Sequence, residues 1–102
     1  MSLIGVSATF SASHNDPVRQ EMHGHSYLVT AWWPSQPDRD AVCLQMTLRE
    51  VVAHGFDHKT LPAELSRAEA MSAAIKGLMD GCVAVDIARP LEGLYFEDAR
   101  PR

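Results

Sequence analysis

The chain has 102 residues, a formal net charge of −4 and no cluster of Lys or Arg, so neither a nucleic-acid partner nor an anionic membrane surface is expected. With 46% hydrophobic and 22% charged residues it has the composition of a globular protein, and its length suits one domain spanning 1–102. No disulfide framework, signal peptide or membrane-spanning run is recognised, and we expect a cytoplasmic protein.

Two strands are expected at the start of the chain. In the segment 3–13 every second residue from Ile4 to Ala12 is apolar, and this period of two predicts a half-buried strand. The segment 23–33 alternates in the same way, with its apolar face formed by Tyr27, Val29, Ala31 and Trp33. The segment 15–22 between them contains Asn, Asp and Pro and predicts a hairpin loop.

Two helices and two more strands follow. Apolar residues at helical spacing predict a helix from Ala41 that ends at Gly55. The run from Ser66 to Glu69 (SRAE) fits a capping box and predicts the start of a second helix. The segments 82–88 and 94–97 are then expected to be strands, and the order strand, strand, helix, helix, strand, strand predicts an α+β fold with both helices on one face.

Three histidines form the sharpest chemical signal. His23 and His25 are two residues apart on a predicted strand, so both imidazoles point to the face that carries Tyr27. His14 continues the apolar parity of the first strand, and in an antiparallel hairpin it meets this pair at the loop end. Three converging imidazoles suit a zinc ion with an open fourth position, although an isolated H-x-H is more often a pair of packed histidines.

Asp57 and His58 are adjacent residues after the first predicted helix. A carboxylate beside an imidazole can fix its tautomer and make it a general base. Adjacency in sequence does not ensure contact, and the spacing alone favours a solvated loop.

These segments together resemble a known family. Residues 10–14 (FSASH), 23–27 (HGHSY) and 56–61 (FDHKTL) are similar in order and approximate spacing to the pattern of 6-pyruvoyl-tetrahydropterin and 6-carboxy-tetrahydropterin synthases. The resemblance extends over most of the chain. It implies the tunnelling fold, a four-stranded antiparallel sheet with two helices on one face, which assembles into barrel-like homo-oligomers.

The resemblance also implies roles for individual residues. The zinc ligands would be His14, His23 and His25, and the catalytic pair would be Asp57 and His58. The implied activity is that of a carbon–oxygen lyase, which eliminates triphosphate from dihydroneopterin triphosphate.

Two positions depart from the family pattern. Arg19 stands where the family has its nucleophilic cysteine, and neither Cys43 nor Cys82 fits that place. Some relatives use a glutamate just before H-G-H, and Glu21 is close to that position. The glutamate that anchors the pterin is replaced by Ile87, and the neighbouring Asp86 could substitute only if its strand bulged.

The sequence therefore supports two main hypotheses. The first is a zinc-dependent lyase acting on dihydroneopterin triphosphate or a related pterin, with Glu21 as substitute base. The second is a non-catalytic, zinc-binding subunit of the same fold, which the changes at Arg19 and Ile87 favour. An unrelated metal-binding module with a similar H-x-H is a third reading.

Overall fold

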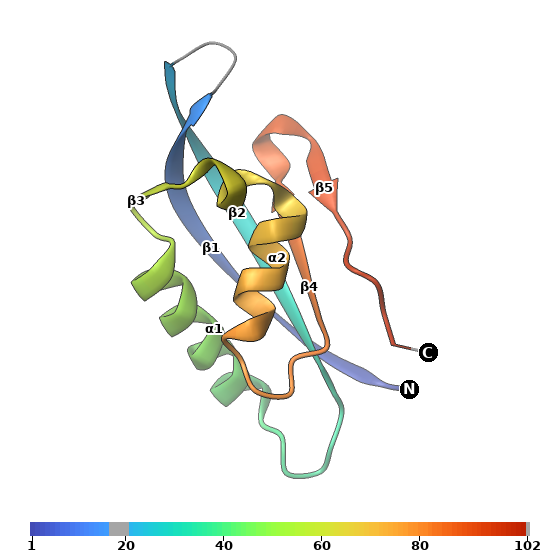
Figure 1. Cartoon of the computed structure of the whole chain (residues 1–102). Coiled ribbons are helices and arrows are strands. Elements are labelled where there is room, and N and C mark those ends of the chain that lie inside the picture. Colours follow the sequence, from blue (N-terminus) through green and yellow to red (C-terminus); the bar gives the residue numbers. More distant parts are fainter. Residues whose placement is uncertain (17–20, 102) are drawn as a thin grey trace.

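The computed structural model describes residues 1–16 and 21–101, without the side chains of Asn15, Asp16, Glu21 and His23. Two helices lie against one face of a five-stranded sheet (Figure 1). The elements in chain order are β1 (Leu3–Asp16), β2 (Glu21–Pro34), α1 (Ala41–Gly55), β3 (Lys59–Leu61), the 3₁₀ turn η1 (Ala63–Ser66), α2 (Ala68–Gly77), β4 (Ala84–Arg89), the 3₁₀ turn η2 (Pro90–Glu92) and β5 (Leu94–Phe96). No helix in these ranges is long and apolar enough to span a bilayer.

The α+β class is confirmed, and the four predicted strands β1, β2, β4 and β5 pair antiparallel, but the sheet has a fifth strand that was not predicted. The strand order is β3-β1-β2-β4-β5, and β3 runs parallel to β1, so the sheet is mixed. The extra strand has only three residues, which is too short to show a period in the sequence. It forms because the chain leaving α1 turns back along the edge of β1, where Ala12 pairs with Lys59 and His14 with Leu61.

The β1–β2 hairpin determines the length of the molecule. Its pairing is continuous from Leu3 opposite Pro34 to Asp16 opposite Glu21, so both strands reach further than the predicted loop at 15–22 allowed. Fourteen residues at a rise of ~3.3 Å span roughly 46 Å. The longest dimension of the molecule is 49 Å, which shows that the hairpin sets it.

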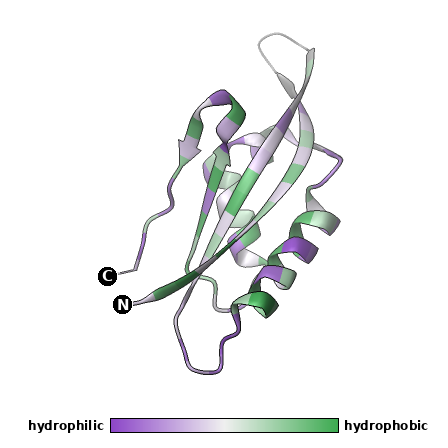
Figure 2. Ribbon diagram, turned by 180° about the vertical axis from the view of Figure 1, so that it is seen from behind, coloured by the Kyte–Doolittle hydropathy of each residue, from purple (hydrophilic) through white to green (hydrophobic). Residues whose placement is uncertain are grey.

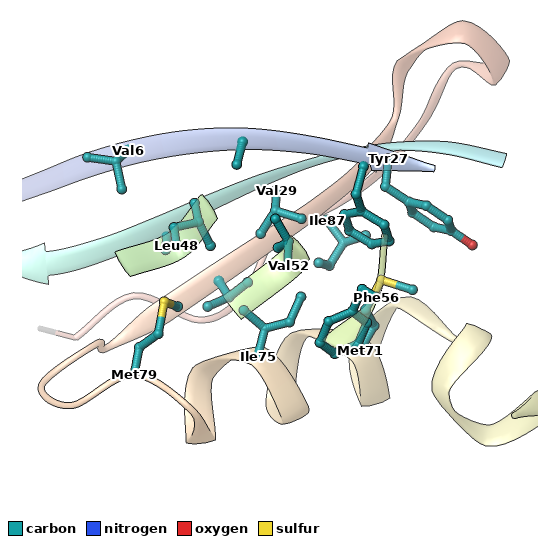
Figure 3. Packing of buried hydrophobic residues seen from close by; sticks show 14 of the residues in the cluster. Val6, Tyr27, Val29, Leu48, Val52, Phe56, Met71, Ile75, Met79 and Ile87 are labelled. Atoms are coloured by element: carbon teal, nitrogen blue, oxygen red, sulfur yellow. The ribbon is translucent and has the colours of Figure 1, made fainter. Parts of the chain in front are cut away.

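The core lies between the sheet and the helices, as the alternating pattern predicts. The even-numbered residues of β1 from Val6 to Ala12 and the odd-numbered residues of β2 from Tyr27 to Trp33 are buried. Helix α1 packs Leu48 and Val52 against them, and α2 packs Met71 and Ile75 (Figure 3). Burial of these residues places both helices on the same face of the sheet.

The predicted capping box at the start of the second helix is wrong. Ser66 is the last residue of η1, and its hydroxyl donates to the carbonyl oxygen of Ala63 at 2.7 Å. Helix α2 begins at Ala68, and its N-cap residue Arg67 makes no side-chain capping bond. The backbone N–H of Ser66 donates to the carbonyl oxygen of Pro62, so both the backbone and the side chain of Ser66 form hydrogen bonds within η1 and with the residue before it.

The outer face of the sheet carries many small and polar residues together with the large ring of Trp32. Figure 2 views the molecule from behind and shows hydrophobic and hydrophilic residues alternating along the strands. The Trp32 ring lies on Gly5, its register partner, and its Nε1 donates to Asp86 at 2.9 Å. The Arg100 guanidinium lies 5.0 Å from the ring centroid and also bonds Asp86. These contacts hold the ring in place.

We predict that Gly5→Ala destabilises the protein. A Cβ at Gly5 would lie 2.5 Å from the Trp32 ring, which Asp86 and Arg100 keep from moving aside. Overpacking of this kind costs about 1–3 kcal/mol, measurable by urea unfolding. The matched control is Gly24→Ala in β2, where an added Cβ meets nothing within 4 Å. Equal stability of the two variants would contradict the packing described here.

Candidate functional site

His14 and His25 meet at the loop end of the β1–β2 hairpin. The register places His14 opposite His23 and Ala12 opposite His25, so the two imidazoles are diagonal neighbours on the helix-covered face. Their Nε2 atoms lie 3.0 Å apart, and their rings stack with centroids 5.1 Å apart. The structure thus brings together two of the three predicted zinc ligands.

The donor set fits a zinc ion in chemistry and in the spacing of its nitrogens. Two imidazoles on a tetrahedral zinc, each with Zn–N of about 2.0–2.1 Å, hold their nitrogens roughly 3.3 Å apart. The Nε2 atoms of His14 and His25 are close to this spacing. Among the residues with described side chains, no group of three His, Cys, Asp or Glu could hold a metal ion. The third predicted ligand, His23, has its backbone at the same end, but its side chain lies outside the description.

The carboxylate of Glu92 contacts the Nδ1 side of the His25 ring. Its Oε2 lies 2.9 Å from Nδ1 of His25, which places the ring proton on Nδ1 and leaves Nε2 with a lone pair. A carboxylate in this position is the usual second partner of a metal-bound histidine. The short turn η2 carries Glu92 to this place, and the sequence pattern gave no sign of it.

Arg89 is the other residue that the sequence analysis did not identify. Its Nη1 donates to Nε2 of His25 at 3.0 Å, and its Nε lies 3.5 Å from the Glu92 carboxylate. Arg89 continues the parity of the buried Val85 and Ile87 in β4, so its position on the helix-covered face could have been inferred. A metal and this guanidinium compete for the same lone pair, so Arg89 must turn aside when His25 binds a metal.

Stacked aromatic rings connect this histidine pair to the core. The Tyr27 ring stacks on Phe10 with centroids 4.8 Å apart and meets the edge of the His25 ring at 6.0 Å. Tyr27 is only 3% exposed, and no group in the described part of the chain forms a hydrogen bond with its hydroxyl. Burial raises the pKa of Tyr27, and the nearby Arg89 guanidinium opposes that shift. Figure 3 shows the hydroxyl at the outer end of the packed cluster.

A cavity of about 410 Å³ adjoins Tyr27 and His14. Helix α2 and η1 contribute one wall, and β4 and β5 contribute the other. The lining residues are His14, Tyr27, Ser66, Arg67, Ala68, Ile87, Ala88, Arg89, Leu94, Tyr95 and Phe96. Its volume suits a small organic molecule.

Asp57 and His58 form a hydrogen-bonded pair. Oδ2 of Asp57 lies 2.9 Å from Nδ1 of His58, and Oδ1 accepts the backbone N–H of Ser11 at 3.0 Å. The bond from Ser11 is the main reason why the pKa of Asp57 is lowered, and the bond to His58 adds to it. The sequence spacing favoured a solvated loop here, whereas the fold creates a defined contact at the edge of β1.

The backbone of His58 has φ +57°, a left-handed conformation that residues other than glycine rarely adopt. Its N–H donates to the carbonyl oxygen of Ser11 at 2.6 Å, which holds the strained residue in place. The side chain is 84% exposed and lines a second cavity of about 380 Å³ together with Gly24 and His25. An imidazole oriented by a carboxylate and open to solvent can transfer protons.

The remaining candidate residues lie apart or outside the description. Cys43 lies in the first turn of α1, which follows the Pro34 end of β2, and Cys82 precedes Val83, whose N–H donates to the carbonyl oxygen of Trp32 near the same end. Burial raises the pKa of the Cys82 thiol. Arg19 and the side chain of Glu21 are outside the described residues. Neither cysteine is therefore placed to act at the histidine pair.

Ile87 and Asp86, the two positions of β4 discussed in the sequence analysis, lie on opposite faces of the sheet. Ile87 is 3% exposed and packs in the core, and the pairing of β4 with β2 continues through it without a bulge. Asp86 consequently points to the outer face, where it bonds Trp32 and Arg100. Asp86 was expected to substitute for a pterin-anchoring glutamate only if its strand bulged, and this condition is not met, because a regular strand sends adjacent side chains to opposite faces.

Comparison with solved structures identifies the fold. The structure of Caenorhabditis elegans 6-pyruvoyl tetrahydropterin synthase superposes with a TM-score of 0.66 and 16% sequence identity, over 96% of each chain. No protein-family model and no curated protein sequence matches the chain. The resemblance inferred from the sequence is confirmed for the fold. A sequence identity of 16% does not by itself show a shared activity or a shared set of site residues.

We predict that the carboxyl of Asp57 titrates below its ordinary value near 3.8. Because the folded chain favours its deprotonated form, the resulting stability is fully present above the ordinary pKa and is lost as pH falls through the folded pKa. NMR titration of the carboxyl carbon measures this directly. The stability difference between the wild type and Asp57→Asn should also narrow in acid. A carboxyl that titrates at or above its ordinary value would contradict the contact with Ser11.

Proposed function

We propose that this chain is a zinc-dependent, 6-pyruvoyl-tetrahydropterin-synthase-like lyase that acts on dihydroneopterin triphosphate or a related pterin. The observation that carries the proposal is the 3.0 Å approach of the His14 and His25 Nε2 atoms, with Glu92 behind His25. The fold shared with the C. elegans enzyme agrees with it. His23 completes the proposed ligand set from its place opposite His14.

The protein's own groups have distinct tasks in this proposal. When bound, zinc supplies Lewis-acid chemistry that polarises substrate hydroxyls and acidifies the neighbouring C–H. Asp57 holds Nδ1 of His58, so that Nε2 of His58 is available to take up or release a proton. Glu21, at the start of β2, is the proposed substitute for the missing cysteine base.

A homo-oligomer belongs to the same proposal. On the β1 edge Ala12, Ser13 and His14 pair with β3, and the backbone of Ser11 bonds Asp57 and His58. Among the described residues no strand pairs with this edge from there to Leu3, which leaves that part of the edge for another copy. Light scattering of the zinc-loaded protein should give a mass above that of one chain, and a monomer mass at micromolar concentration would remove this part of the proposal.

A non-catalytic zinc-binding subunit of the same fold is the second candidate. The observation that favours it is Ile87, which is buried where the resemblance implies a pterin-anchoring carboxylate. The two candidates differ in turnover and not in metal binding.

We predict about one zinc ion per chain, measured by metal analysis after mild purification. His14→Ala and the double variant His23→Ala/His25→Ala should lose the metal. Glu92→Gln should weaken zinc affinity about 10–100-fold, because it removes the negative charge that makes His25 a more basic ligand. His54→Ala is the matched control, since His54 is exposed on α1, where its Nε2 lies 4.0 Å from the Glu50 carboxylate. Unchanged zinc content in the double variant would refute the proposed centre.

We predict slow release of triphosphate from dihydroneopterin triphosphate by the zinc-loaded protein. His58→Ala and Glu21→Gln should reduce the rate ~10²–10⁴-fold, the usual cost of removing a general base. Cys43→Ser and Cys82→Ser should leave the rate unchanged, since both cysteines lie at the far end of the sheet. Pterin binding without turnover would instead identify the non-catalytic subunit, and inactivation by Cys43→Ser would show that the base is wrongly assigned.

A further inference from the structure

The described residues that line the 410 Å³ cavity include arginines but no acidic residue, so they provide no carboxylate with which to bind a ligand. Arg67 and Arg89 line this cavity, and no Asp or Glu is among the described residues that line it. Each guanidinium also has a carboxylate at 3.5 Å outside the lining, Glu69 for Arg67 and Glu92 for Arg89. Ile87 is part of the same wall and supplies only apolar surface. A ligand in this cavity therefore meets hydrogen-bond donors and apolar side chains.

Three donor groups face the cavity from different elements. The hydroxyl of Tyr27 is buried and has no hydrogen-bond partner in the described part of the chain. A buried polar group without a partner costs stability, so a hydroxyl left in this state points to a ligand that completes it. The Arg89 guanidinium, one-quarter exposed, is the second donor.

The start of α2 is the third donor. The first N–H groups of a helix have no acceptor within the helix, and the N-cap residue Arg67 provides no side-chain bond to them. Ser66, Arg67 and Ala68 line the cavity at this point. A helix N-terminus favours negative charge, which adds to the effect of the two guanidinium groups.

The apolar wall indicates the rest of the ligand. Leu94, Tyr95 and Phe96 of β5 line the cavity on the side of Ile87. Such a wall packs against a flat ring, which prefers offset or edge contacts with aromatic side chains.

We propose that this cavity binds the acid group, a carboxylate or a phosphate, of a planar small molecule, with Arg89 and the Tyr27 hydroxyl as the groups that recognise it. This inference rests on the proposed function in one respect, namely that the cavity adjoins the His14–His25 centre. It assigns the anionic end of the substrate to the α2–β4 wall. Arg89 leaves its 3.0 Å contact with His25 to make this bond, while its contact with Glu92 keeps it nearby.

The test compares pterin-6-carboxylate with unsubstituted pterin, which has the same ring without the acid group. Binding is measured by fluorescence and calorimetry, in metal-free and in zinc-loaded protein. The acid should bind about tenfold or more tightly, the ratio expected for a charge-assisted hydrogen bond. Arg89→Met should abolish the preference, and Tyr27→Phe should reduce it several-fold while leaving the ring in place.

Arg49→Met on α1 is the matched control, since Arg49 lines a different cavity. Thermal unfolding of each variant checks folding, and Tyr27→Phe tests the proposal even if Arg89→Met does not fold.

Displacement of pterin-6-carboxylate by inorganic triphosphate would identify a phosphate ligand, whereas failure to displace it would identify a carboxylate. Equal affinity for the two pterins in the wild type, or a preference unchanged in both variants, would overturn the proposal. Zinc content is measured separately, so failure of the metal centre and failure of the anion site are distinguishable.

Discussion

The continuous pairing of β1 with β2 is the constraint on which the rest of the structure depends. Because side chains alternate along a strand, a slip of one residue would send every buried residue to the opposite face. The pairing that buries Phe10 and Tyr27 therefore also fixes His14 and His25 on the helix-covered face. Core and candidate metal centre belong to one alternating pattern. The Tyr27 ring joins them, because it stacks on Phe10 and contacts His25 edge-on.

The surroundings of His25, at the loop end of the hairpin, depend on β4 and η2. His25 receives a carboxylate from Glu92 and a guanidinium from Arg89, two groups that lie more than sixty positions away in sequence. On the same face of β4, Ile87 takes the place of an expected carboxylate. Ile87 gives the wall of the 410 Å³ cavity an apolar surface at this position, and Arg89, two residues later, adds a positive charge.

The outer face of the sheet holds the C-terminal segment in position. Asp86 accepts from Trp32, from Arg100 and from the backbone N–H of Asp98, and Asp98 in turn bonds Lys76 of α2 at 2.8 Å. These bonds attach the residues after β5 to β4 and to α2. Since η2 connects β4 to β5, the same attachment helps to hold Glu92 beside His25.

Sequence alone determined the class of the fold, the helical stripe of α1, the core face of β1 and β2, and the convergence of His14 with His25, since period and parity are local properties of the chain. Tertiary structure decided what local patterns do not encode. The three-residue β3 forms only because β1 offers an edge, and the contact of Asp57 with His58 is fixed by the backbone of Ser11. Glu92 and Arg89 reach His25 only because β4 pairs with β2 and the chain then turns back at η2, and a pairing between distant segments has no local period.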